Sequence, residues 1–165
     1  MNKEEILNEI KKTKQHLADM EKMLKECEYE RWKPEEGGLY YFLNTYETTD
    51  VNEFCSTEYA DIMRYKTYNC FETKVQAEQE AEKILVRRML EDIARRLNKG
   101  QKIDWDDEDQ RKYFIRFNYW TYIIELDSSW KNKFQGVIYC LDKNFLDVTI
   151  QEIGEERLVK YLRGE

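Results

Sequence analysis

Histidine and proline are almost absent from this chain, which holds one of each in 165 residues. The single histidine, His16, lies inside a run of helix-forming residues, so a Ser or Cys nucleophile has no histidine base in a loop beside it. The four cysteines, Cys27, Cys55, Cys70 and Cys140, form no CxxC pair and stand far apart. A zinc site would need these remote cysteines to converge. We therefore expect no catalytic residues, no metal and no cofactor.

Long apolar runs are also missing. No stretch reaches the ~18 apolar residues that a membrane-spanning helix needs, so no membrane span is expected. The first five residues are mostly charged and follow a helical pattern, unlike a secretion signal. Cysteines that form no motif are typical of reduced, buried thiols, and reduced thiols are the rule in the cytosol. These features together predict a cytoplasmic protein.

Positive charge is in deficit. The chain has 27 Lys and Arg against 34 Asp and Glu, a formal net charge of -7. Phosphate backbones are bound by clustered Lys and Arg, so direct nucleic-acid binding is not expected. A partner protein with a basic surface, or with a site that normally holds nucleic acid, matches this charge better. Four arginines near the end of a predicted helix are interpreted as its solvated face: Arg87, Arg88, Arg95 and Arg96.

The first 30 residues predict one long helix with a heptad seam. The seam positions are Ile6, Ile10, Leu17, Met20, Leu24 and Cys27. In a parallel dimer, Glu9 would face Lys14 of the second helix, which is an attractive pair. The seam fits either a dimerising coiled coil or an amphipathic helix that folds back on its own domain, and both alternatives stay open. A homodimer is the expected state.

Residues 31–165 predict a single α+β domain, since 41% of the chain is hydrophobic and its 12 Tyr, 7 Phe and 4 Trp can fill a core. We expect strands at 39–43, 64–71, 112–117, 122–126 and 136–140. Helices are expected at 74–98, in a run ending at 153–154, and at 155–162, with a loop or irregular hairpin at 44–63. A weak repeat at an offset of 69 suggests two ββα halves, 38–99 and 110–162. The economical assembly is one small antiparallel sheet with helices on one face.

Several phrases of the sequence, taken together, cover most of the chain. They are Arg31-Trp32-Lys33-Pro34 before Gly38-Leu39-Tyr40-Tyr41, Asn69-Cys70-Phe71-Glu72-Thr73-Lys74, Asp104-Trp105 before Gln110-Arg111, and Ile153-Gly154-Glu155-Glu156-Arg157-Leu158. As a set they resemble a family of small, uncharacterised accessory proteins of Firmicutes phages and prophages. The resemblance implies a phage accessory protein acting in the host cytoplasm, and it supplies no catalytic residues. One departure is that Thr67-Tyr68 stand where a glycine-containing turn is expected.

A dense acidic run precedes the third predicted strand. It consists of Asp104, Trp105, Asp106, Asp107, Glu108 and Asp109. A calcium loop starting at Asp104 would need Gly at its sixth position and Glu at its twelfth, where this chain has Asp109 and Ile115. The run is therefore not a calcium site, and we interpret it as a candidate partner-binding segment.

Trp105, Trp120 and Trp130 lie among turn residues and carboxylates. Each could plug an end of the sheet, or could serve as an interface residue, because Trp and Tyr dominate binding hot spots. Trp105 is the strongest interface candidate because of its acidic neighbours, which would set association rate and partner choice. The leading hypothesis is an inhibitor of a host defence protein, such as an anti-CRISPR protein, whose acidic run occupies a basic groove of a CRISPR effector.

Two other classes of function stay open. The first is a structural or assembly protein that oligomerises through its N-terminal helix. The second is a metal-dependent nuclease that uses Asp61, Glu72 and Lys74, because two carboxylates and a lysine can serve Mg²⁺ chemistry. Against the nuclease, Thr73 between Glu72 and Lys74 is better explained as the N-cap of the helix that follows.

Overall fold

The computed structural model describes residues 9–20 and 31–165. The chain divides into two units, Met1–Lys33 and Pro34–Glu165. In the first unit, residues 9–20 are helical, and the seam residues Ile10, Leu17 and Met20 are exposed. The other predicted seam positions, Ile6, Leu24 and Cys27, lie outside the described residues.

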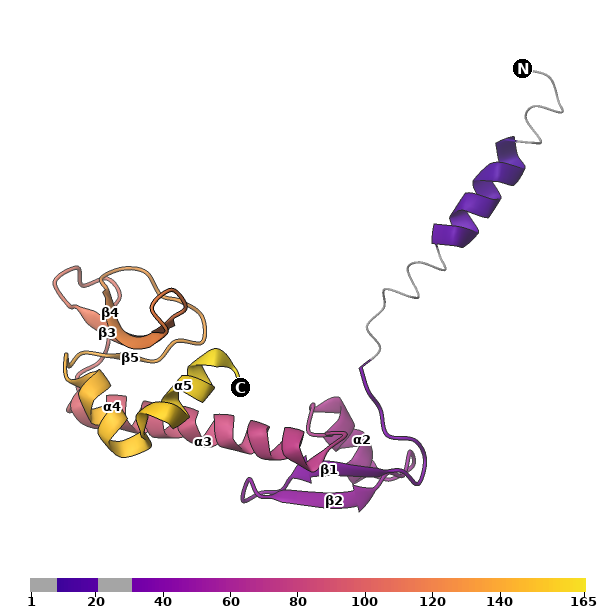
Figure 1. Ribbon diagram of the computed structural model, residues 1–165, viewed down its shortest axis with the longest axis horizontal. Helices are drawn as coiled ribbons and strands as arrows, with labels where there is room; N and C mark the ends of the chain where they lie inside the picture. Colours follow the sequence, from indigo (N-terminus) through magenta and orange to yellow (C-terminus); the bar gives the residue numbers. More distant parts are fainter. Residues whose placement is uncertain (1–8, 21–30) are drawn as a thin grey trace. The chain divides into compact units, whose positions relative to one another are not determined.

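The second unit is an α+β domain, as predicted (Figure 1). Its elements in chain order are β1 (Leu39–Leu43), β2 (Thr49–Glu53), α2 (Tyr59–Lys66), α3 (Lys74–Leu97), β3 (Lys112–Asn118), β4 (Ile123–Ser129), β5 (Tyr139–Cys140), α4 (Phe145–Ile153) and α5 (Glu155–Arg163). The strands form two antiparallel sheets rather than the single sheet that the sequence suggested. One is β1-β2, and the other has the order β4-β3-β5.

The predicted strand at 64–71 is wrong, and its first residues belong to helix α2. Arg64 makes an ion pair with Asp61, three residues earlier, at 3.1 Å, which is a helical neighbour spacing. The helix is followed by Tyr68, which has a left-handed φ of 63°. Beyond it, only one isolated bridge, Tyr41 to Phe71, extends the first sheet. The side chain of Asn69 instead bonds the backbone N–H and C=O of Leu43, where a further strand would pair.

Helix α3 forms as predicted because its start is capped. The Thr73 side chain accepts a hydrogen bond from the N–H of Gln76, and the Gln76 side chain accepts one from the N–H of Thr73. This reciprocal pair is a capping box, which satisfies two N–H groups that the helix cannot use itself. The helix contacts β1 and β2 as well as β5, α4 and α5. It is therefore the element that both sheets share.

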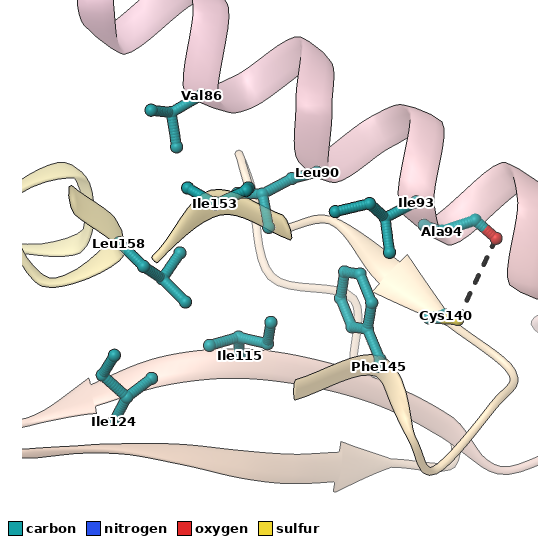
Figure 2. Close-up of a cluster of buried hydrophobic side chains, with 10 residues drawn as sticks. All are labelled: Val86, Leu90, Ile93, Ala94, Ile115, Ile124, Cys140, Phe145, Ile153 and Leu158. Atoms are coloured by element: carbon teal, nitrogen blue, oxygen red, sulfur yellow. Dashed lines mark hydrogen bonds between the residues drawn. The ribbon is translucent and has the colours of Figure 1, made fainter. Parts of the chain in front are cut away.

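The main core lies between α3, α4 and α5 and the second sheet (Figure 2). Its buried members are Val86, Leu90, Ile93, Ala94, Ile115, Ile124, Cys140, Phe145, Ile153 and Leu158. Burial raises the pKa of the Cys140 thiol, so this cysteine stays neutral and behaves as a small apolar residue. No helix in the described part of the chain combines the length and apolarity needed to cross a bilayer.

Candidate functional site

The acidic run is an exposed loop, residues 104–109, in the connection between α3 and β3. We call it the acidic loop. All five of its carboxylate residues are exposed, and Trp105 is half-buried. The structure thus places the predicted partner-binding residues together on one surface segment.

Two carboxylates of the acidic loop hold its backbone. Oδ1 of Asp104 accepts a hydrogen bond from the N–H of Asp106 at 2.9 Å. Oδ1 of Asp107 accepts from the N–H groups of Asp109 and Gln110 at 2.9 and 3.2 Å. The side-chain oxygen of Gln110 closes the loop by accepting from the N–H of Asp104 at 2.7 Å. These turns give the loop one defined shape.

A buried lysine anchors the loop to the sheet. Lys112, the first residue of β3, has 0% exposed surface. Its ammonium donates to the backbone oxygens of Asp107 at 2.8 Å and Trp130 at 3.1 Å. It also lies 5.5 Å from the ring centre of Trp105. A buried charge is tolerated only when such partners replace water, so Lys112 ties the loop backbone firmly to the end of the sheet.

Trp105 packs the loop onto the domain. Its ring meets the ring of Tyr139 edge-on, with centres 4.9 Å apart and an interplanar angle of 85°. The ammonium of Lys133 lies 5.9 Å from the Trp105 ring centre. The half-buried ring therefore anchors the loop to the domain, and the exposed side chains of the loop are its carboxylates.

Asp106 and Asp109 are the carboxylates left open to a partner. Within the described chain, neither side chain accepts a hydrogen bond or joins an ion pair. Glu108, in contrast, pairs with Lys131 at 2.5 Å. The site thus combines two free negative charges with a backbone that is already held in place.

The other two candidate interface tryptophans, Trp120 and Trp130, occupy different positions. Trp130 is 45% exposed, and the guanidinium of Arg111 lies 4.9 Å from its ring centre. Trp120 is 94% exposed, in the connection between β3 and β4. The sequence indicated Trp105 as the strongest interface candidate because of its acidic neighbours. In the structure Trp120 is the more exposed of the two, because it lies in the hairpin turn.

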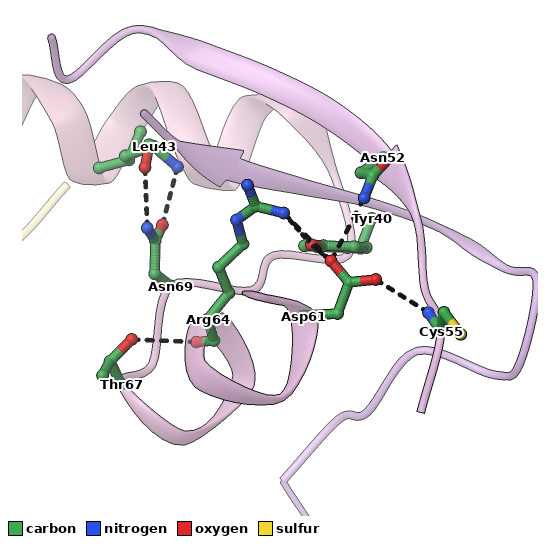
Figure 3. Close-up of polar contacts among 8 residues, drawn as sticks. All are labelled: Tyr40, Leu43, Asn52, Cys55, Asp61, Arg64, Thr67 and Asn69. Carbon is green, nitrogen blue, oxygen red and sulfur yellow. Dashed lines mark hydrogen bonds and ion pairs between the residues drawn. The ribbon is translucent and has the colours of Figure 1, made fainter. Parts of the chain in front are cut away.

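Asp61, the first member of the nuclease hypothesis, is a buried structural group (Figure 3). Its Oδ1 accepts from the hydroxyl of Tyr40 at 2.6 Å, from Asn52 at 3.2 Å and from Arg64 at 3.1 Å. Its Oδ2 accepts from the N–H of Cys55 at 2.9 Å. Burial alone would raise the pKa of Asp61, but these four donors outweigh it and lower the pKa below its usual value.

The remaining members of the nuclease hypothesis are not organised around a metal. Glu72 is exposed, and Lys74 pairs with Glu78 at 3.1 Å on the surface of α3. Across residues 9–20 and 31–165, no three His, Cys, Asp or Glu side chains gather into a group that could hold a metal ion. The four hydrogen bonds to Asp61 give this residue a structural role, because they join α2 to β1 and β2.

A groove of about 400 Å³ lies between α3 and α5. Its charged lining is paired internally: Arg157 donates to both carboxylate oxygens of Glu82, and the Lys83 ammonium donates to the Gly164 carbonyl at 2.8 Å. The bonds from Arg157 lower the pKa of Glu82. The groove is therefore a helix–helix junction in which Glu82, Lys83 and Arg157 are already bonded within the domain.

The chain matches no protein-family model, and comparisons with curated proteins and with solved structures found no match. Its function must therefore be inferred from its own residues.

Proposed function

We propose that this protein is a non-enzymatic inhibitor that binds a basic surface of another protein through the acidic loop. In this proposal it is a phage accessory protein, and its partner is a host defence protein with a nucleic-acid-binding groove, such as a CRISPR effector. The observation that carries the proposal is the pair of free carboxylates, Asp106 and Asp109, on a loop whose backbone is anchored by buried Lys112.

The anchoring matters because ordering a loop on binding costs free energy. In this loop Asp104 and Asp107 already bond to backbone N–H groups, so the shape is set before a partner arrives. The free charges can then act on the partner from fixed positions. The net charge of -7 adds a long-range attraction to a basic surface and speeds encounter.

A double charge reversal tests the acidic loop. Asp106→Lys with Asp109→Lys should abolish capture of the partner from a lysate of a Firmicutes host, and should lower the association rate at low salt by about tenfold or more. The matched control is Glu53→Lys with Glu80→Lys, two exposed carboxylates elsewhere that change the net charge equally. If both double variants behave alike, only net charge matters and the loop is not the site.

Lys112→Met separates loop shape from net charge in the same assay. The substitution makes the protein more negative, so a purely electrostatic account predicts tighter binding to a basic partner. Loss of the two bonds to the Asp107 and Trp130 carbonyls should instead loosen the loop and weaken binding. A thermal melt of the variant shows whether the domain itself stays folded.

A second candidate function is assembly through the N-terminal helix. The observation that favours it is the exposed stripe formed by Ile10, Leu17 and Met20. The two functions are compatible, because a dimer would present two acidic loops to a partner.

A further inference from the structure

The turn between β3 and β4 carries three exposed aromatic residues in four positions. Trp120 is 94% exposed, Tyr122 is 74% exposed and Tyr119 is 62% exposed. We call Tyr119, Trp120 and Tyr122 the aromatic tip. Trp and Tyr are the residues most enriched in binding hot spots, so a cluster of them on a protruding turn needs an explanation beyond the core.

The aromatic tip is held rigidly by Asn118. Its side-chain oxygen accepts from the N–H groups of Trp120 at 2.9 Å and Thr121 at 3.3 Å. Its backbone oxygen accepts from the N–H of Tyr122 at 2.8 Å, and its side-chain nitrogen donates to Glu125 at 2.7 Å. Tyr122 adopts a left-handed φ of 58°, which costs a non-glycine residue free energy. Strain of this kind tends to gather at functional positions.

The two tyrosines rest on the domain, whereas the tryptophan does not. The ring of Phe117 meets Tyr119 edge-on at 5.0 Å and Tyr122 at 6.3 Å. Trp120, with nearly all of its surface in water, adds almost nothing to the stability of the fold. The exposed indole of Trp120 thus lies in a turn that hydrogen bonds with Asn118 and ring contacts with Phe117 hold in place.

The charge around the tip selects the partner. Residues 117–130 contain no Lys or Arg, and their carboxylates are Glu125 and Asp127. The nearest preceding cation, Arg116, is paired with both, at 3.1 and 3.2 Å. Two carboxylates against one guanidinium leave a net charge of -1 on this surface, which disfavours anionic membranes and phosphate backbones. A cation over an aromatic face is favoured, and the base of the tip already shows one, since the guanidinium of Arg163 lies 5.7 Å from the ring centre of Phe117.

We propose that the aromatic tip docks into an apolar pocket rimmed by Lys or Arg on a partner protein, with Trp120 as the anchor. The tip and the acidic loop lie at opposite ends of β3, a seven-residue strand that spans about 20 Å. A single partner can therefore contact both. The proposal shares with the proposed function the premise of a protein partner, but it depends on different residues.

Site-specific cross-linking tests the tip directly. Trp120 is replaced by the photo-cross-linker p-benzoylphenylalanine in the full chain, which is irradiated in a lysate of a Firmicutes host, and the cross-linked peptides are sequenced by mass spectrometry. Tyr46, which is 86% exposed on another turn, carries the cross-linker in the control. We expect position 120, and not position 46, to join peptides of a single partner that contain both apolar residues and Lys or Arg. Cross-links to a second copy of this chain, or the absence of protein cross-links at position 120, would overturn the proposal, and sedimentation on phosphatidylcholine vesicles would then identify a lipid surface as the ligand.

Binding to the partner so identified gives the quantitative test. Trp120→Ala should weaken binding by about thirtyfold, while Tyr46→Ala should leave it unchanged. Because Trp120 is so exposed, its replacement is not expected to disturb folding. If Trp120→Ala binds normally while the double reversal at Asp106 and Asp109 does not, the tip proposal fails and the acidic loop stands. The opposite result would support the tip and remove the acidic loop as the binding site.

Discussion

Asp61 is an ionised side chain in the protein interior, and its partners show how it is tolerated. Four donors from β1, β2, α2 and the segment between β2 and α2 converge on its two oxygens. Together they fix α2 against the first sheet. A charge of this kind is stabilising only while all of its partners are present, because a buried group left unpaired keeps its full desolvation cost.

Replacing this charge should be costly in a pH-dependent way. Asp61→Asn should lower the free energy of unfolding by about 3 kcal/mol at neutral pH. The folded-state pKa of Asp61 is lowered, so its ionised form adds stability above the unfolded pKa of about 3.9, and that stability is lost as the pH falls through the folded value. The gap between wild type and variant should therefore narrow in acid, as measured by urea unfolding from about pH 7 to about pH 2. Glu53→Gln, at an exposed position, should have nearly the same free energy of unfolding as the wild type at every pH. A difference between Asp61→Asn and the wild type that does not change with pH would contradict this account.

Tyr68 shows the cost of a missing glycine. It stands in the turn where a glycine was expected, and its φ of 63° is the conformation that glycine adopts without strain. Tyr68→Gly should raise the free energy of unfolding by about 0.5–1 kcal/mol, because the left-handed strain on the side chain outweighs the extra chain entropy of glycine. Thermal unfolding measures the change. Tyr46→Gly, at an exposed position without a left-handed φ, should instead be neutral or slightly destabilising, and equal effects at the two positions would refute the argument.

At the scale of elements, α3 decides the architecture. It is 24 residues long, and its buried residues run from Ala77 near its start to Ala94 near its end. The strands β1 and β2 of the first sheet and β5 of the second contact this one helix, whereas β3 contacts α4 and α5 and β4 contacts α4. The stability of its first turn therefore affects how firmly the part of the domain with β1 and β2 is held.

The capping box of α3 can be tested alone. Thr73→Ala removes the side-chain oxygen that accepts from Gln76, and it should lower the free energy of unfolding by about 1 kcal/mol. Thr73→Ser keeps that oxygen and should cost much less. Hydrogen exchange at the amides of the first turn should rise in the Ala variant only. Similar exchange in both variants would show that packing, not the cap, holds this end.

The elements also show which sequence signals were sufficient. The start of α3 was predicted because a Thr cap preceded a long, strongly periodic segment, and that pattern is local. The segment 64–71 was misassigned because its alternation is short and because the partner of Arg64 lies upstream, at Asp61. The sequence predicted an extended run at 136–140, but only Tyr139 and Cys140 pair with β3, and that pairing between distant segments is not visible in the local pattern.

For the molecule as a whole, the number of copies that act together sets how many binding surfaces a partner meets. The described helix of the first unit exposes Ile10, Leu17 and Met20, and stripes of this type are covered by a partner helix in coiled coils. A dimer would double the number of acidic loops and aromatic tips.

Light scattering on the full chain tests this arrangement. We expect a dimer mass, and Leu17→Asp should shift it to the monomer because a charge in the seam opposes helix pairing. Ala18→Asp adds the same charge one position outside the seam and should leave the dimer intact. A monomer mass for the unmodified chain would remove the assembly function.

The sequence by itself determined the α+β class, the long capped helix and the acidic run, because each depends on local composition or periodicity. It also indicated that charge would favour a basic partner. Only the tertiary structure decided which charged and aromatic side chains are exposed and which are buried. Lys112 and Asp61 are charged residues of types that are usually exposed, yet both are buried, Lys112 against the Trp130 carbonyl and Asp61 against the Tyr40 hydroxyl, each from a distant segment. Likewise, Trp105, Trp130 and Trp120 have similar neighbours in the sequence, but Trp105 is half-buried, Trp130 is about half exposed and Trp120 is almost fully exposed. Their exposure depends on which strands and loops pack nearby rather than on neighbours in the chain.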